Sequence, residues 1–213
     1  MKLYTVSGLG ADEKVLEKLT FNPGIEVVHI PWLIPHLDEE LSDYVARMSA
    51  FVDDSEPFYL LGYSFGGIIV QEIHKIKPAK KVVILGSIRS DAEKSKLIKA
   101  GEKTNALKYI PLRFFSDSGT VFYSFFRKLL DPKNPRLLQY FRVKDPYYLK
   151  WSMDKVAHWK SEKIPGVVQI MADKDIVFPL KNSQPDFVIK NATHLFPATK
   201  PKEVSQILKS IFI

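Results

Sequence analysis

Residues 59–70, YLLGYSFGGIIV, place a serine between glycines in the middle of an apolar run. The apolar residues before the serine are typical of a buried strand, and those after it are spaced as in a helix. A chain that passes directly from a strand into a helix needs a sharp turn, and Gly62 and Gly66 give that turn steric clearance. The segment therefore predicts a strand–turn–helix unit with Ser64 at its apex.

A similar alternation of strands and helices runs along most of the chain. Short β-rich apolar runs predict six strands, at 2–7, 25–30, 58–63, 81–87, 167–171 and 186–190. Helical spacing predicts helices at 11–19, 37–52, 66–77 and 200–213. Strands that alternate with helices are typical of βαβ units, so the sequence predicts an α/β fold with a mostly parallel six-stranded sheet and helices on both faces.

Residues 88–160 interrupt this alternation. Strand-like runs are absent from this part of the sequence, which holds 13 of the 26 aromatic residues and 16 Lys and Arg against 7 Asp and Glu. Its interior, 114–126, is too apolar to be a linker. We interpret 88–160 as a mostly helical cap inserted into a core formed by 1–87 and 161–213, with its aromatic residues forming a small core of their own or facing a ligand.

Composition narrows the possible functions. The absence of cysteine excludes a disulfide scaffold, a thiolate metal site and a cysteine nucleophile. The net charge of +7 comes from dispersed lysines and arginines without a nucleic-acid-binding motif, which favours a solvated surface and no nucleic-acid partner. The first residues lead straight into a strand, and no apolar run approaches the length of a membrane span, so we expect a cytoplasmic protein.

Residues 62–66, GYSFG, match the G-x-S-x-G pattern of a nucleophilic serine, with a predicted strand before and a predicted helix after. In that context the positive end of the helix points at Ser64, where an oxyanion would form. The alternative is a glycine-rich turn with an incidental serine. The context favours Ser64 as a nucleophile.

A serine hydroxyl needs a base, usually a histidine that a carboxylate orients. In folds of this type the acid and then the histidine follow the serine along the chain. Among the five histidines only His194 has a suitable acid before it, at the end of a late strand. We predict Asp175 as this acid, because the apolar turn after it would bury its carboxylate; Asp173, the alternative, would instead cap the following turn.

A second donor to an oxyanion is expected from the loop after the first strand. The glycines of 7–10, SGLG, allow a tight turn that leaves the backbone N–H of Leu9 free. Together with the N–H of Phe65 it would form an oxyanion hole. A glycine turn before a helix is common, so this prediction depends on the serine, histidine and aspartate.

These motifs together resemble the α/β-hydrolase superfamily: GYSFGG as the nucleophile elbow, ADKDIVFP as the acid loop and THLF as the histidine loop. The resemblance covers 1–87 and 161–213. The chain departs from the family in starting at what resembles the third strand, and in having Ser7 where the oxyanion loop commonly has histidine. The resemblance implies a reduced core with strands in the order second, first, third, fourth, fifth, sixth.

The resemblance also implies an activity, the hydrolysis of an ester, thioester or related acyl bond through an acyl-enzyme on Ser64, with neither cofactor nor metal. Acyltransferases and carbon–carbon bond hydrolases of the superfamily use the same residues, so they remain alternatives. A ligand-binding or sensing module is a further alternative.

The expected partner is a small-molecule acyl substrate. The aromatic residues of 88–160 favour an apolar substrate, and the positive charge of the same segment allows an anionic one. Trp32 and Pro35 follow the second strand, so they are candidates for lining the substrate pocket.

Overall fold

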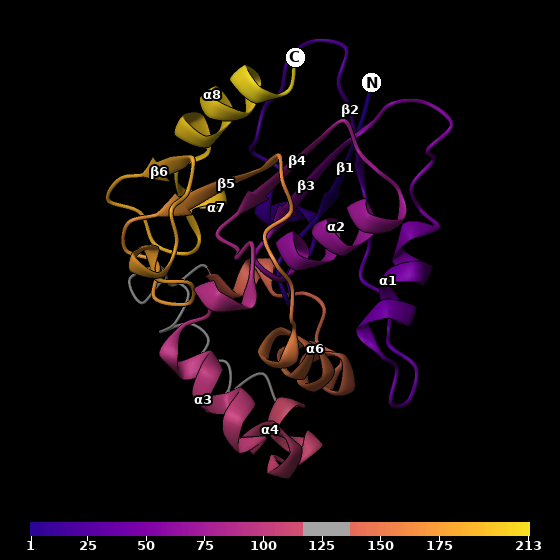
Figure 1. The fold of residues 1–213 in the computed structure, drawn as a ribbon, viewed down its shortest axis with the longest axis vertical. Coiled ribbons are helices and arrows are strands. Elements are labelled where there is room, and N and C mark those ends of the chain that lie inside the picture. Colours follow the sequence, from indigo (N-terminus) through magenta and orange to yellow (C-terminus); the bar gives the residue numbers. More distant parts are fainter. Residues whose placement is uncertain (117–136) are drawn as a thin grey trace.

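A six-stranded sheet forms the centre of the molecule (Figure 1). The computed structural model describes residues 1–116 and 137–213. The strands are β1 (Lys2–Val6), β2 (Glu26–His29), β3 (Tyr59–Tyr63), β4 (Lys81–Leu85), β5 (Val167–Ala172) and β6 (Phe187–Ile189). Their order is β2-β1-β3-β4-β5-β6 and every neighbouring pair is parallel. The predicted fold class and strand order are confirmed.

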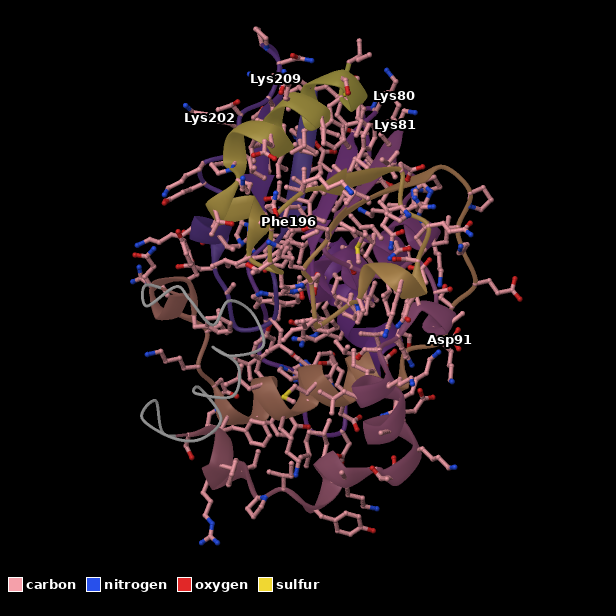
Figure 2. The ribbon with its side chains drawn as sticks, turned by 90° about the vertical axis from the view of Figure 1, so that its left-hand side faces the viewer. Lys80, Lys81, Asp91, Phe196, Lys202 and Lys209 are labelled. Carbon is pink, nitrogen blue, oxygen red and sulfur yellow. The ribbon has the colours of Figure 1, made fainter. Side chains whose placement is uncertain are left out.

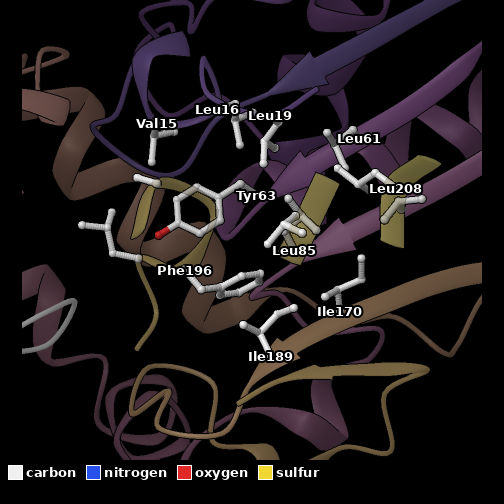
Figure 3. Packing of buried hydrophobic residues seen from close by; sticks show 14 of the residues in the cluster. Val15, Leu16, Leu19, Leu61, Tyr63, Leu85, Ile170, Ile189, Phe196 and Leu208 are labelled. Carbon is white, nitrogen blue, oxygen red and sulfur yellow. The ribbon is translucent and has the colours of Figure 1, made fainter. Parts of the chain in front are cut away.

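Helices cover both faces of the sheet. Successive side chains of each strand point to opposite faces, so a strand of apolar residues makes both faces apolar and both must be covered. On one face, Leu60 packs with α1 (Leu41–Ser49) and α2 (Phe65–Ile76). On the other, Leu61 belongs to an apolar layer that also holds Phe196 of α7 (Phe196–Thr199) and Leu208 of α8 (Pro201–Ile211), as Figure 3 shows. The core therefore lies in two layers, with the sheet between them.

The predicted helix at 11–19 is wrong. The structure has only the short 3₁₀ helix η1 (Glu13–Val15) there, followed by turns. The backbone of this segment is held by distant residues instead: Ala11 forms an antiparallel bridge with Phe141, and the oxygen of Gly10 accepts from the N–H groups of Arg142 (3.0 Å) and Val143 (3.1 Å). These bonds compete with a continuous helix from residue 11.

The described residues between β4 and β5 are largely helical. They form η2 (Asp91–Glu93), α3 (Lys96–Thr104), α4 (Ala106–Tyr109), η3 (Leu112–Phe115), η4 (Leu137–Tyr140) and α6 (Pro146–His158). In Figure 1, α3, α4 and α6 lie beyond the carboxyl ends of the strands. Most of the aromatic-rich stretch predicted to form this segment's interior, from 117 to 126, lies outside the described residues.

The register of the parallel strands brings their carboxyl ends to one edge. Tyr63 of β3 lies opposite Leu85 of β4, which in turn lies opposite Ile170 of β5. Loops that follow these strands therefore emerge side by side, at the edge where open α/β sheets bind ligands. No helix in the described part of the chain is long and apolar enough to cross a membrane.

Candidate active site

Ser64 stands alone between β3 and α2 in a backbone conformation that few side chains adopt. Its φ is 54° and its ψ is −120°. Two hydrogen bonds fix this turn: the Ser64 N–H donates to the oxygen of Leu85 and the Gly67 N–H donates to the oxygen of Ser64, both at 2.9 Å. A strained conformation persists only where its surroundings enforce it, and such residues cluster at functional sites.

Gly62 and Gly66 allow the first turn of α2 to lie in direct contact with the backbone of neighbouring segments. A Cβ added at Gly66 would overlap the carbonyl oxygens of Val6 and Ser7, and one added at Gly62 would overlap the backbone of Gly66 itself. The predicted need for clearance at these two positions therefore has a direct steric cause.

His194 lies between Ser64 and Asp175. It comes from the loop between β6 and α7, and only 1% of it is exposed. Its Nε2 is 2.9 Å from the Ser64 Oγ, and its Nδ1 is 2.7 Å from the Asp175 Oδ2. The structure thus brings together the serine, histidine and aspartate that the sequence singled out.

Asp175 is held by its own loop. It is 4% exposed, and its Oδ1 accepts hydrogen bonds from the N–H groups of Val177 (2.8 Å) and Phe178 (3.0 Å). With Oδ1 occupied in this way, Oδ2 faces His194. An ionised Asp175 favours the tautomer with a proton on the histidine Nδ1, which leaves Nε2 free to accept the Ser64 hydroxyl proton.

Asp173, the alternative acid, has a different role. Its two carboxylate oxygens accept from the N–H groups of Asn191 (3.0 Å) and Ala192 (3.1 Å), just before His194 in the chain. Desolvation raises the pKa of Asp173, but these two N–H donors together with the charges of Lys174 and Lys190 outweigh it, so its pKa is lower than usual. Asp173 therefore anchors the loop that carries His194.

Two further residues near His194 were not singled out from the sequence. The Tyr63 hydroxyl donates to the backbone oxygen of His194 at 3.1 Å, and burial, reinforced by the charge of Asp175, raises the pKa of Tyr63 well above its usual value. Gly86 has a φ of 51°, and a Cβ there would lie 3.4 Å from the His194 ring. Tyr63 lies inside the G-x-S-x-G motif, and this is its sequence signal; no comparable pattern marks Gly86.

The backbone N–H groups of Leu9 and Phe65 belong to the loop after β1 and to the start of α2, which both border the cavity beside Ser64. Leu9, Ser64, Phe65 and His194 all border the same cavity. Phe65 is the first residue of α2, where N–H groups have no partner within a helix. Leu9 follows β1, whose neighbour in the sheet is β3. This placement is compatible with the predicted pair of donors to the carbonyl oxygen of an acyl group on Ser64, which stays a prediction.

The cavity beside Ser64 has a volume of about 270 Å³ and is almost entirely apolar. Its floor comes from the carboxyl edge of the sheet, and its walls include Leu97 and Ile98 of α3, Leu107 of α4 and Met153 of α6. Among its described lining residues there is no lysine, arginine, aspartate or glutamate. The expectation of an anionic substrate thus gains no support from these walls, whereas an apolar group fits them.

Trp32 and Pro35 do not line this cavity among the residues that the structure describes. The Trp32 ring lies instead against Phe65, with ring centroids 5.2 Å apart and planes at 7°. Lys80, Lys81, Lys202 and Lys209 lie at the end of the molecule opposite α3 and α4 (Figure 2), whereas the excess of positive charge in the sequence falls within 88–160.

Within the described ranges, 1–116 and 137–213, no group of three or more His, Cys, Asp or Glu side chains is arranged to hold a metal ion. His194 Nε2, at 2.9 Å from Ser64 Oγ, is placed to accept the proton of the serine hydroxyl.

Comparison with known proteins identifies the fold. No protein-family model and no curated protein matches the sequence. Solved structures do match: a thermophilic esterase from Thermogutta terrifontis is 14% identical, with a TM-score of 0.69 over 100% of this chain and 89% of that one. A lipase-esterase related protein from Clostridium acetobutylicum is 18% identical, with a TM-score of 0.65 over 98% and 93%.

An α/β hydrolase fold protein from Burkholderia ambifaria is similar as well, at 13% identity and a TM-score of 0.66 over 98% of this chain and 90% of that one. This chain therefore has the α/β-hydrolase fold, and the resemblance inferred from its motifs is confirmed at the level of the fold.

We predict that Gly66→Ala destabilises the protein by about 3 kcal/mol or more, because the added methyl group must displace the backbone of β1 or α2. Urea denaturation would measure this change. Gly101→Ala is the control, since a Cβ there meets nothing within 4 Å. In the helix α3 this control should stabilise by up to about 1 kcal/mol. Equal effects of the two substitutions would contradict the steric explanation.

The lowered pKa of Asp173 predicts how stability changes with pH. Its folded value lies below that of the unfolded chain, so the stabilisation is present at neutral pH and is lost as pH falls through the folded value. The melting temperature of Asp173→Asn should therefore lie furthest below wild type above about pH 5 and approach it below about pH 4. Glu17→Gln, at an exposed position, is the control. A difference that is constant down to pH 2 would refute this role.

Proposed function

We propose that this protein is a serine hydrolase that cleaves an ester, thioester or related acyl bond of a small molecule through an acyl-enzyme on Ser64. The observation that carries the proposal is the buried His194, hydrogen-bonded to both Ser64 and Asp175 at the foot of an apolar cavity. The esterase and the lipase-esterase related protein that share its fold support the same class of reaction.

In the proposed mechanism, Ser64 Oγ attacks the substrate carbonyl carbon while His194 Nε2 accepts the hydroxyl proton. The Asp175 carboxylate stabilises the imidazolium that forms, at 2.7 Å from Nδ1. The N–H groups of Leu9 and Phe65 donate to the oxyanion of the tetrahedral intermediate. His194 then gives its proton to the leaving group, and the acyl-enzyme remains. Water next attacks the acyl carbon while His194 accepts a proton from the water. His194 finally returns that proton to Ser64 Oγ as the acid leaves.

For the substrate, we propose an apolar acyl or ring group that occupies the cavity between the sheet edge and the helices of 88–160, which act as a cap. The support is the chemistry of the walls: burial of each CH₂ group against them contributes about 0.8 kcal/mol. A cavity of about 270 Å³ is near the lower limit for small-molecule pockets, which favours a short or medium acyl chain.

A fluorophosphonate probe tests the proposed nucleophile. Wild type should gain one adduct by intact mass, and Ser64→Ala and His194→Ala should gain none. Turnover of p-nitrophenyl esters should fall about 100- to 10,000-fold in Asp175→Asn, because the amide favours the wrong histidine tautomer. Asp173→Asn is the matched control and should lose far less activity. Folded wild type that neither reacts with the probe nor hydrolyses esters would refute the hydrolase proposal and favour a binding module.

The cavity predicts a preference in acyl chain length. Leu107→Trp places a larger ring in the cavity wall contributed by α4, so kcat/KM for octanoyl and longer p-nitrophenyl esters should fall at least about tenfold. The value for the acetyl ester should change less than about twofold. Lys108→Trp, on the same helix but outside the described cavity wall, is the control. Equal losses for short and long esters would contradict the proposed acyl site.

A further inference from the structure

The indole of Trp32 contacts both segments that border Ser64, the loop after β1 and the start of α2. One of its faces stacks on Phe65, at 5.2 Å between centroids and 7° between planes. Tyr148 of α6 packs against it as well, at 5.6 Å and 49°. Phe65 and Tyr148 are both almost fully buried, at 1% and 0% exposure. The ring is therefore held between the start of α2 and the cap.

The nitrogen of this indole contacts the loop that follows β1. Trp32 Nε1–H is 3.1 Å from the backbone oxygen of Gly8 and 3.1 Å from that of Ala11. The Gly8 carbonyl and the Leu9 N–H belong to one peptide unit. Because a trans peptide is planar, its C=O and N–H point in opposite directions. A donor that fixes the Gly8 oxygen thus also fixes the direction of the Leu9 N–H.

We propose that Trp32 is a positioning residue for the oxyanion hole, an inference that rests on the proposed hydrolase function. Its N–H orients the peptide whose N–H is one oxyanion donor, and its ring packs on Phe65, whose N–H is the other. Hydrogen bonding to the carbonyl of a peptide also polarises it, which strengthens its N–H as a donor.

Other contacts hold this loop as well, and one of them shares the Ala11 oxygen with Trp32. The Ser7 hydroxyl donates to Ala11 O at 2.7 Å, and the N–H groups of Arg142 and Val143 donate to Gly10 O. The Gly8 oxygen also accepts from the Ala11 N–H at 2.9 Å, but that donor lies in the same turn. The indole connects the Gly8–Leu9 peptide to a different part of the fold, so its loss leaves that peptide held by the turn itself.

Trp32→Phe tests the proposal, because it removes the N–H and keeps an aromatic ring on Phe65. We expect kcat for a p-nitrophenyl ester to fall about tenfold, less than the loss from deleting an oxyanion donor outright, with KM within about twofold of wild type. The affinity for a trifluoromethyl ketone, whose adduct with Ser64 carries an oxyanion, should fall by the same factor as kcat/KM.

Trp159→Phe is the matched control. Trp159 is buried, at 4% exposure, whereas Trp32 is partly buried; the Trp159 Nε1–H donates to Glu72 Oε1 at 2.8 Å, outside the described cavity wall. This variant should lose stability without a change in kcat or ketone affinity. If both variants lower the melting temperature and neither changes kcat, Trp32 is only a structural residue and the proposal fails.

A second form of the test keeps the size of the side chain. Benzothienylalanine incorporated at position 32 replaces the indole N–H by sulfur and preserves the bicyclic ring. It should reproduce the kcat and ketone effects of Trp32→Phe at near wild-type melting temperature, and wild-type values for both would refute the proposal. Wild type that shows neither ester turnover nor ketone binding would refute the hydrolase function itself, which is a distinct outcome.

Discussion

The close approach of α2 to β1 is the constraint on which the candidate site depends. Gly66 brings the first turn of α2 against the carbonyl oxygens of Val6 and Ser7, so that a Cβ has no space there. Ser64, just before that turn, is forced to a φ of 54° and is held by its hydrogen bond to Leu85. A hydroxyl presented in this way is exposed to the cavity while its backbone is rigid. Preorganised groups of this kind need no rearrangement at the moment of reaction.

The parallel sheet then determines which segments meet at Ser64. Three loops follow β1, β5 and β6, and contribute Leu9, Asp175 and His194 respectively. These residues are far apart in the sequence, but their strands end at one edge. Hydrogen bonds hold two of these loops: Asp173 fixes the turn before His194, and the N–H groups of Val177 and Phe178 orient Asp175. The candidate site thus consists of local turns that follow strands of one parallel sheet.

Much of this arrangement could be predicted because it depends on local patterns. Short β-rich apolar runs between helix-like segments predicted the strands, and the glycines around Ser64 predicted the turn. The segment 11–19 failed because its helical spacing was outweighed by hydrogen bonds from residues 142 and 143, more than 120 positions away. The position of Trp32 could not be predicted for a similar reason, since its partners Gly8, Phe65 and Tyr148 come from three separate segments.

The backbone pairing of Gly10 and Ala11 with residues 141–143 has a consequence for how such a fold diversifies. Backbone hydrogen bonds join residues 141–143, which lie between β4 and β5, to the loop that carries Leu9, so the segment between these strands cannot be exchanged at its two ends alone. A replacement insertion must also provide an extended stretch in register with Gly10 and Ala11. Changes in the cavity wall are therefore easier to accommodate in α3 and α4, which line the cavity, than around residues 141–143, which pair with Gly10 and Ala11.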